Sequence, residues 1–135
     1  MTEETLTAPT QGVIPYISLV GASDAADLYK AAFGAVETRR MAGEDGRLMH
    51  CNLVINGGSL MLSDAFPEHG YAWQPSHSFT MQLVVDDIDS WFKRAVDAGL
   101  EIVQPVQLMF WGDRYGALKD RFGVHWAINE PAAAA

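Results

Sequence analysis

The stretch SDAADLYKAAFG, residues 23–34, decides the fold because the chain repeats its character in DDIDSWFKRAVDAG, residues 86–99. Both stretches are typical of a helix that ends at a glycine, the residue that best adopts the left-handed conformation after a last turn. The two closing glycines lie 65 residues apart, and so do Gly58 and Gly123. One spacing that relates two pairs of landmarks indicates an internal duplication.

Short apolar segments rich in β-branched and aromatic residues surround both predicted helices, and they predict strands. One strand precedes each helix: VIPYISLV (13–20) in the first half and FTMQLVV (79–85) in the second. Three strands follow each helix, and turn residues separate them: VETRRM (36–41), RLMHCNLVI (47–55), SLMLSD (59–64), EIVQPVQLM (101–109), RYGALKD (114–120) and VHWAINE (124–130). The pattern predicts two βαβββ modules. Ser23 and either Asp86 or Asp87 are the expected helix N-caps.

The composition fits one small globular domain that does not bind nucleic acid. The 135 residues are 49% hydrophobic, which suffices for a core, and a formal charge of −8 repels phosphate backbones and anionic membranes. The start MTEETLTAPTQG lacks the features of a signal peptide, and no apolar run reaches the roughly 18 residues of a membrane span. The single cysteine, Cys51, fits a reducing compartment. We expect a soluble, cytoplasmic protein.

Six stretches of the sequence carry a family resemblance. The most specific runs from Phe110 to Trp126 and contains the core WGDRYG. The others are IPYISL, DLYKAAFGA, RLMHCNL, SLMLSDAF and VVDDIDSWFKRAVDAG. Together they resemble the PhnB-like branch of the vicinal-oxygen-chelate (glyoxalase/bleomycin-resistance/dioxygenase) superfamily over nearly the whole domain. The resemblance implies an α+β fold in which the two modules form a cupped, mixed or antiparallel sheet with the helices outside and the ligand on the concave face.

The expected domain boundaries follow from this fold. Flexible tails at 1–12 and 132–135 flank a single domain, 13–131. Its modules span 13–66 and 77–131, and the segment 67–76 joins them as a linker or lid, or as a cover for an apolar edge or a dimer seam.

The resemblance also places the metal ligands of the superfamily on this sequence, at Ile14, His50, Thr80 and Ala127. Metal-binding members use His and Glu there, because such metals need converging imidazole nitrogens and carboxylate oxygens. Only His50 is of that type here. We therefore expect no cofactor and no metal site, with a divalent metal at a divergent site as the alternative.

Alternation of side chains along each strand then predicts which residues line the concave face. His50 is the candidate catalytic residue, as a general base or a group that orients the ligand, and the alternative is a histidine bonded to Asn52 or a strand neighbour. Alternation also places Leu48 in the cup and Met49 and Cys51 on the helix-covered face. The predicted ligand-binding residues are Tyr16, Ser18, Asn52, Thr80, Gln82, Trp111, Arg114, Tyr115 and His125.

Each of these residues also has a structural interpretation. The polar side chains can satisfy one another, the tyrosines can pack by their rings, and Arg114 can be held in ion pairs with aspartates. Cys51 is expected to be a core residue, and Asp64 either a turn or a site residue. No nucleophile elbow and no HExxH motif is present. A glycine-rich nucleotide-binding strand–turn–helix is also missing, so methyl transfer from S-adenosylmethionine is not expected.

Two functions of different classes follow from the resemblance. The first is a binding protein that holds a small organic ligand in the concave sheet without metal. The second is a lyase or oxygenase of the glyoxalase/dioxygenase type, with a divergent metal site or acid–base catalysis by His50. In both cases the sheet edges predict a homodimer, and neither nucleic acid nor membrane is an expected partner.

Overall fold

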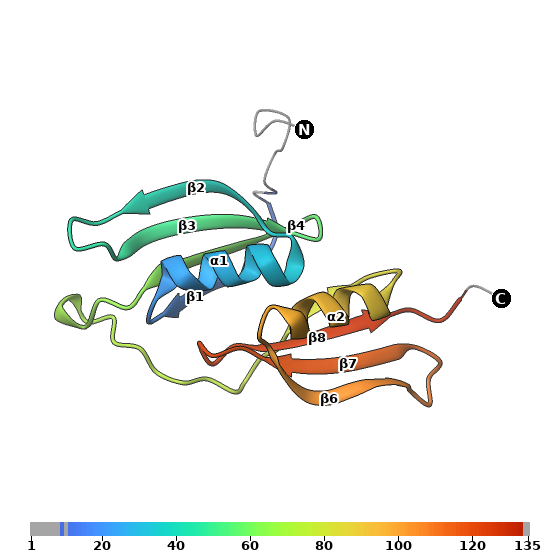
Figure 1. Cartoon of the computed structure of the whole chain (residues 1–135). Helices are drawn as coiled ribbons and strands as arrows, with labels where there is room; N and C mark the ends of the chain where they lie inside the picture. Colours follow the sequence, from blue (N-terminus) through green and yellow to red (C-terminus); the bar gives the residue numbers. More distant parts are fainter. Residues whose placement is uncertain (1–8, 10, 134–135) are drawn as a thin grey trace. The chain divides into compact units, whose positions relative to one another are not determined.

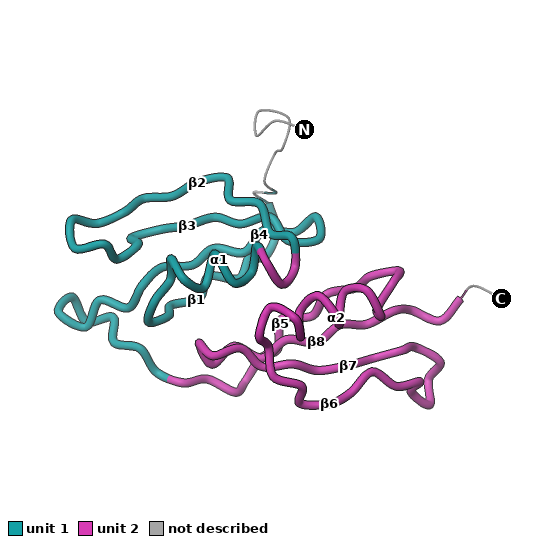
Figure 2. The backbone as a smooth tube through the Cα atoms, in the orientation of Figure 1, with its two compact units in different colours: residues 1–30, 34–74 teal, residues 31–33, 75–135 magenta. Residues whose placement is uncertain are grey.

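The computed structural model describes residues 9, 11–133 of the chain and divides them into two compact units. The first comprises residues up to Lys30 and Gly34–Gln74, and the second comprises Ala31–Phe33 and Pro75 onward (Figure 2). The predicted tails, 1–12 and 132–135, lie largely outside the described residues. Each unit holds one four-stranded mixed sheet (Figure 1).

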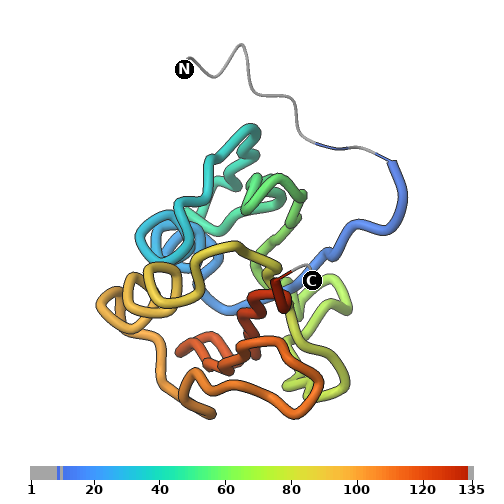
Figure 3. The backbone as a smooth tube through the Cα atoms, turned by 90° about the vertical axis from the view of Figure 1, so that its right-hand side faces the viewer, coloured from blue at the N-terminus to red at the C-terminus, as the bar shows by residue number. Residues whose placement is uncertain are grey.

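The first unit contains strands β1 to β4 and most of the first helix. The elements run β1 (Tyr16–Leu19), α1 (Ala22–Phe33), β2 (Val36–Ala42), β3 (Leu48–Ile55) and β4 (Gly58–Asp64), followed by the short 3₁₀ helix η2 (Pro67–His69). The sheet order is β1-β4-β3-β2, in which only β1 and β4 are parallel. Helix α1, nearly end-on in Figure 3, covers one side of this sheet.

The second unit repeats this topology with β5 (Met81–Val84), α2 (Ile88–Asp97), β6 (Glu101–Leu108), β7 (Arg114–Lys119) and β8 (His125–Glu130). Its sheet order is β5-β8-β7-β6, and its outer pair β5 and β8 is again parallel. The predicted α+β fold of two βαβββ modules is therefore confirmed. The repeat makes β4 the counterpart of β8, and β3 the counterpart of β7.

The core of each unit lies between its helix and one face of its sheet. In the first sheet the paired residues Ile17, Leu62 and Cys51 are all buried there. In the second, Trp126, Ile128 and Leu118 are at most 2% exposed. Burial of such side chains is the main stabilising contribution in a domain of this size.

An acid from the last strand of each module, buried Asp64 in the first and half-buried Glu130 in the second, caps the helix of that module. The carboxylate of Asp64 accepts hydrogen bonds from the backbone N–H groups of Gly21 and Ala22, at 2.8 and 3.0 Å. In the second unit Glu130 accepts from the N–H of Ile88 at 3.0 Å, and Asp87 is the N-cap as predicted. The prediction of Ser23 as an N-cap is wrong, because the cap is Gly21 in a left-handed conformation and the acceptor comes from β4.

Candidate functional site

Four of the predicted site residues lie on the face of the first sheet that α1 does not cover. We call Tyr16, Ser18, His50 and Asn52 the first polar face. Strand pairing places one row across the sheet, from Tyr16 through Met61 and Asn52 to Arg39. The first polar face is therefore a continuous surface of β1, β4, β3 and β2.

Tyr16 and His50 form a hydrogen-bonded pair on this face. The phenolic oxygen of Tyr16 lies 3.2 Å from Nδ1 of His50, and the two rings are tilted with centroids 5.6 Å apart. Tyr16 is 51% exposed, while His50 is half-buried. An imidazole held by a phenol in an accessible place can exchange a proton with a ligand.

Asn52 is buried on the same face with one half of its amide unsatisfied. Its Nδ2 donates to Oγ1 of Thr38 at 2.7 Å, whereas Oδ1 has no hydrogen-bond partner among the described residues. Exchanging the amide nitrogen and oxygen leaves the other atom without a partner, so this observation does not depend on the assignment of the two atoms. Buried polar groups are nearly always hydrogen-bonded, and this exception marks Asn52.

Two irregularities in the pairing of β2 with β3 shape this face. One is an extra residue on β2 between Glu37 and Arg39, which brings Thr38 against Asn52. The other lies where Met41 pairs with His50 but Ala42 pairs with Leu48, so that Met49 is the extra residue. A bulge of one residue reverses the alternation of side chains beyond it.

The second irregularity corrects the predicted faces of two residues. Leu48 is buried at 1% exposure and does not belong to the polar face, whereas Met49 is 55% exposed instead of helix-covered. The predicted faces hold from His50 onward, because Cys51 pairs with buried Leu62 on the helix side and Asn52 pairs with Met61 on the polar face. The prediction was therefore wrong only on the side of the bulge toward the β2–β3 turn.

In the second unit, three predicted site residues share the sheet face opposite α2. We call Gln82, Tyr115 and His125 the second polar face. Gln82 pairs with Ala127, and Ala127 pairs with Ala117, so these three residues share one face of the sheet. Tyr115 is two positions from Ala117 and His125 is two positions from Ala127, so both lie on that face as well. Nε2 of His125 lies 3.1 Å from Nδ1 of His77, a contact that was not predicted from the sequence.

The remaining three predicted residues lie elsewhere in the second unit. Thr80 is exposed and precedes β5, and Trp111 is 49% exposed in the β6–β7 turn with its ring against Phe110. Arg114 lies on the helix side of β7, where both terminal nitrogens bond the carboxylate of Asp89 at 2.9 Å. These hydrogen bonds hold the pKa of Asp89 below its ordinary value.

The residues at the expected metal positions do not fit a metal held by several protein ligands. Ile14 and Ala127 have no ligating atoms, and the described residues contain no group of three or more His, Cys, Asp or Glu side chains able to hold a metal. Ala127 lies on β8, whose counterpart in the first unit is β4, whereas His50 lies on β3.

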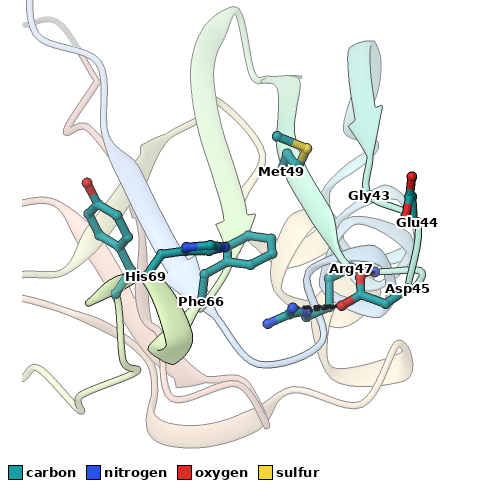
Figure 4. A pocket seen from close by; sticks show the side chains of 8 residues that line it. Gly43, Glu44, Asp45, Arg47, Met49, Phe66 and His69 are labelled. Atoms are coloured by element: carbon teal, nitrogen blue, oxygen red, sulfur yellow. Dashed lines mark hydrogen bonds and ion pairs between the residues drawn. The ribbon is translucent and has the colours of Figure 1, made fainter.

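A separate pocket of about 530 Å³ lies in the first unit beside Met49 (Figure 4). One wall is the β2–β3 turn and the other is the loop after β4, which two backbone hydrogen bonds between Phe66 and Tyr71 close. The sequence analysis recognised this loop only as a linker or lid. The lining residues are Gly43, Glu44, Asp45, Arg47, Met49, Phe66, His69 and Tyr71.

Two βαβββ units, each with a helix on one side of its sheet and a polar face on the other, define the vicinal-oxygen-chelate class of fold. The model of the Glyoxalase/Bleomycin resistance protein/Dioxygenase superfamily matches residues 21–128, and the chain belongs to this superfamily. The resemblance predicted from the sequence is thereby confirmed.

Similar proteins come from several bacteria. Rv0887c of Mycobacterium tuberculosis is 40% identical over 123 residues, which cover 87% of this chain and 72% of that protein. The crystal structure of PA1353 from Pseudomonas aeruginosa superimposes with a TM-score of 0.74 and 25% identity, over 92% of this chain and 100% of the other. A PhnB protein from Bacillus cereus has the same fold, with a TM-score of 0.71 and 18% identity over 90% and 100% of the two chains.

Proposed function

We propose that this chain binds a small organic molecule on its polar faces without the help of a metal. The unsatisfied amide of Asn52 is the observation that carries the proposal. A buried amide atom without a partner costs about 1–3 kcal/mol. A ligand group that inserts far enough to bond this buried atom recovers this free energy on binding, so the missing bond becomes a source of affinity.

The surroundings of Asn52 indicate which ligand groups this face can hold. The side chains of Met61 and Tyr16 offer apolar and aromatic surface in the same row, and the Tyr16–His50 pair offers a donor and an acceptor. A compact molecule with a flat apolar part and one or two hydrogen-bonding groups matches this arrangement. Taken by itself, the second polar face, with Gln82, Tyr115 and His125, is a further candidate surface for such a ligand.

The test is a thermal-shift screen of small organic compounds, followed by titration calorimetry of the hits against the wild type and Asn52→Leu. Leucine has a similar volume and no amide, so the variant should fold at least as stably as the wild type. We expect hits to bind it about tenfold or more weakly, the equivalent of one lost hydrogen bond. Hits that bind both proteins equally would contradict a role of Asn52, and a screen without hits would refute the binding function.

Acid–base catalysis is the second candidate, and the Tyr16–His50 hydrogen bond favours it. A phenol on Nδ1 fixes the orientation of the ring and leaves Nε2 to face a ligand. If the chain is such an enzyme, hits of the screen should be converted slowly to products that mass spectrometry detects. His50→Ala should then abolish turnover, and Tyr16→Phe should reduce it while binding is retained.

Metal content separates the proposal from a divergent metalloenzyme of the family. We expect purified protein to hold less than a stoichiometric amount of transition metal, because ligands of the required types are missing at three of the four expected positions. Elemental analysis measures this directly. One equivalent of metal that disappears in His50→Ala would refute the metal-free proposal.

We also propose that the protein is a cytoplasmic homodimer. None of the helices among the described residues is long and apolar enough to cross a membrane. The formal charge of −8 disfavours nucleic acid, and the single buried cysteine suits the cytoplasm. Strands β2 and β6 end their sheets with largely exposed residues, which supports a homodimer through edge pairing. Light scattering at micromolar concentration tests this, and a monomeric mass would refute it.

A further inference from the structure

The pocket beside Met49 is separate from the amide of Asn52 and has the chemistry of a different ligand. Its volume of about 530 Å³ lies within the range of small-molecule sites, which is roughly 300–1,000 Å³. Its two walls come from segments far apart in the sequence, residues 43–49 and 66–71 (Figure 4).

Arg47, the only lysine or arginine that lines this pocket, is engaged by two carboxylates and a backbone carbonyl. Arg47 donates from Nε to Asp45 at 2.7 Å, and its terminal nitrogens bond Glu68 and the carbonyl of Ala65. These hydrogen bonds raise the pKa of Arg47, lower that of Asp45, and lower that of Glu68 to about 2. Arg47, Asp45 and Glu68 therefore remain charged over the physiological range. An anionic ligand would have to displace one of these carboxylates.

The charge that remains around the pocket is negative. Asp45 and Glu68 together exceed the single charge of Arg47, and Glu44 adds a third carboxylate on the same wall. Glu44 is exposed, and within the described part of the chain no hydrogen bond or ion pair engages its side chain. A cation is therefore the ion that this pocket attracts.

Aromatic rings on the opposite wall are suited to the same ion. The guanidinium of Arg47 already lies over the ring of Phe66, with Cζ 4.3 Å from the ring centroid. Tyr71 is 68% exposed, and the exposed thioether of Met49 adds polarizable surface. Aromatic faces attract cations through the ring quadrupole, most strongly for ammonium groups with apolar substituents.

We propose that this pocket binds a small organic cation with an apolar body, such as an alkylated ammonium attached to an aromatic group. Glu44 supplies negative charge that attracts the head, and Tyr71, Phe66 and Met49 supply aromatic and apolar surface for the cation and its body. This site goes beyond the proposed function, because neither its ligand class nor its residues depend on the first polar face.

Three probes of matched shape test the charge preference by titration calorimetry. They are benzyltrimethylammonium as the cation, benzyl methyl sulfone as the neutral compound and phenylmethanesulfonate as the anion. We expect the cation to bind about tenfold more tightly than the sulfone, and we expect the anion not to bind detectably. Added salt should weaken the binding of the cation. A sulfone or sulfonate that binds as tightly as the cation would refute the proposal.

Variants locate the site and separate it from the first polar face. Glu44→Gln and Tyr71→Ala should each weaken binding of the cation about three- to tenfold. Tyr71→Phe keeps the aromatic ring and should therefore keep the affinity. Glu101→Gln, an exposed carboxylate on β6, is the matched control and should have no effect. Asn52→Leu should leave cation binding unchanged, so loss of binding in this variant, or wild-type binding in Glu44→Gln, would overturn the inference.

Discussion

Gly116 on β7 lies directly under the ring of Phe92 on α2, so closely that a Cβ at position 116 would be 2.6 Å from Cε2 of that ring. The same Cβ would be 3.1 Å from a methyl group of Val106. This contact sets the distance between α2 and its sheet, and it requires the absence of a side chain at Gly116.

Gly116→Ala should therefore destabilise the protein by about 1–3 kcal/mol, the usual cost of overpacking a core. Urea denaturation followed by circular dichroism measures the change in unfolding free energy. Gly58→Ala is the matched control on β4, because a Cβ there meets only a carbonyl at 3.7 Å. Equal effects of the two substitutions would contradict the close packing of Phe92.

Asp64 should be among the most sensitive polar residues of the first unit. Its buried carboxylate accepts three backbone N–H groups, from Gly21, Ala22 and Leu48, and so joins the start of α1 to β3 and β4. Asp64→Ala should lower the unfolding free energy by at least about 2 kcal/mol, since buried donors lose a charged acceptor.

The control for this prediction is Asp24→Ala, which removes an exposed carboxylate from the first turn of α1. Its loss should be only a few tenths of a kcal/mol, as is usual for an exposed charge near a helix terminus. Comparable losses in both variants would indicate that Asp64 acts only through its charge and not through the three hydrogen bonds.

The duplication could be predicted because its signals are local. Each helix is followed by a glycine that terminates it, Gly34 or Gly99, and the strands are short apolar runs between turn residues. The polar faces could be predicted for the same reason, since alternation along a regular strand depends only on that strand.

The failures arise where the structure depends on a neighbouring strand or on a distant residue. The bulge at Met49 exists only in the pairing of β3 with β2, so no pattern within β3 could reveal that Leu48 turns inward. The partner of Arg114 is Asp89, 25 residues away on α2, and the sequence offered nearer aspartates. The pocket was missed because its walls, 43–49 and 66–71, meet only in the folded unit.

Cys51 should be almost unreactive in the folded protein. Burial, with a smaller effect of the nearby Glu37 carboxylate, raises the pKa of its thiol to about 11, so very little thiolate exists at pH 8. Ellman's reagent should react slowly with native protein and rapidly in guanidinium chloride. Ser18→Cys in a Cys51→Ala background places a thiol on an exposed site of β1 and should react rapidly without denaturant. Rapid labelling of native Cys51 would contradict its burial.

The ion pair between Arg47 and Glu68 should be visible in an acid titration. The hydrogen bonds that Glu68 accepts from Arg47 lower the pKa of Glu68 from 4.5 to about 2. The Glu68 carboxylate therefore binds a proton less readily in the folded state than in the unfolded state. The pair therefore stabilises the fold fully above about pH 4.5, and the contribution is lost as the pH falls toward 2. Carbon-13 NMR of the Glu68 carboxyl group measures the midpoint. In Arg47→Gln the midpoint of the Glu68 titration should return toward the ordinary value. The control Arg39→Gln removes an arginine outside the pocket and should leave the midpoint low. An ordinary midpoint in the wild type would show that the ion pair does not persist in solution.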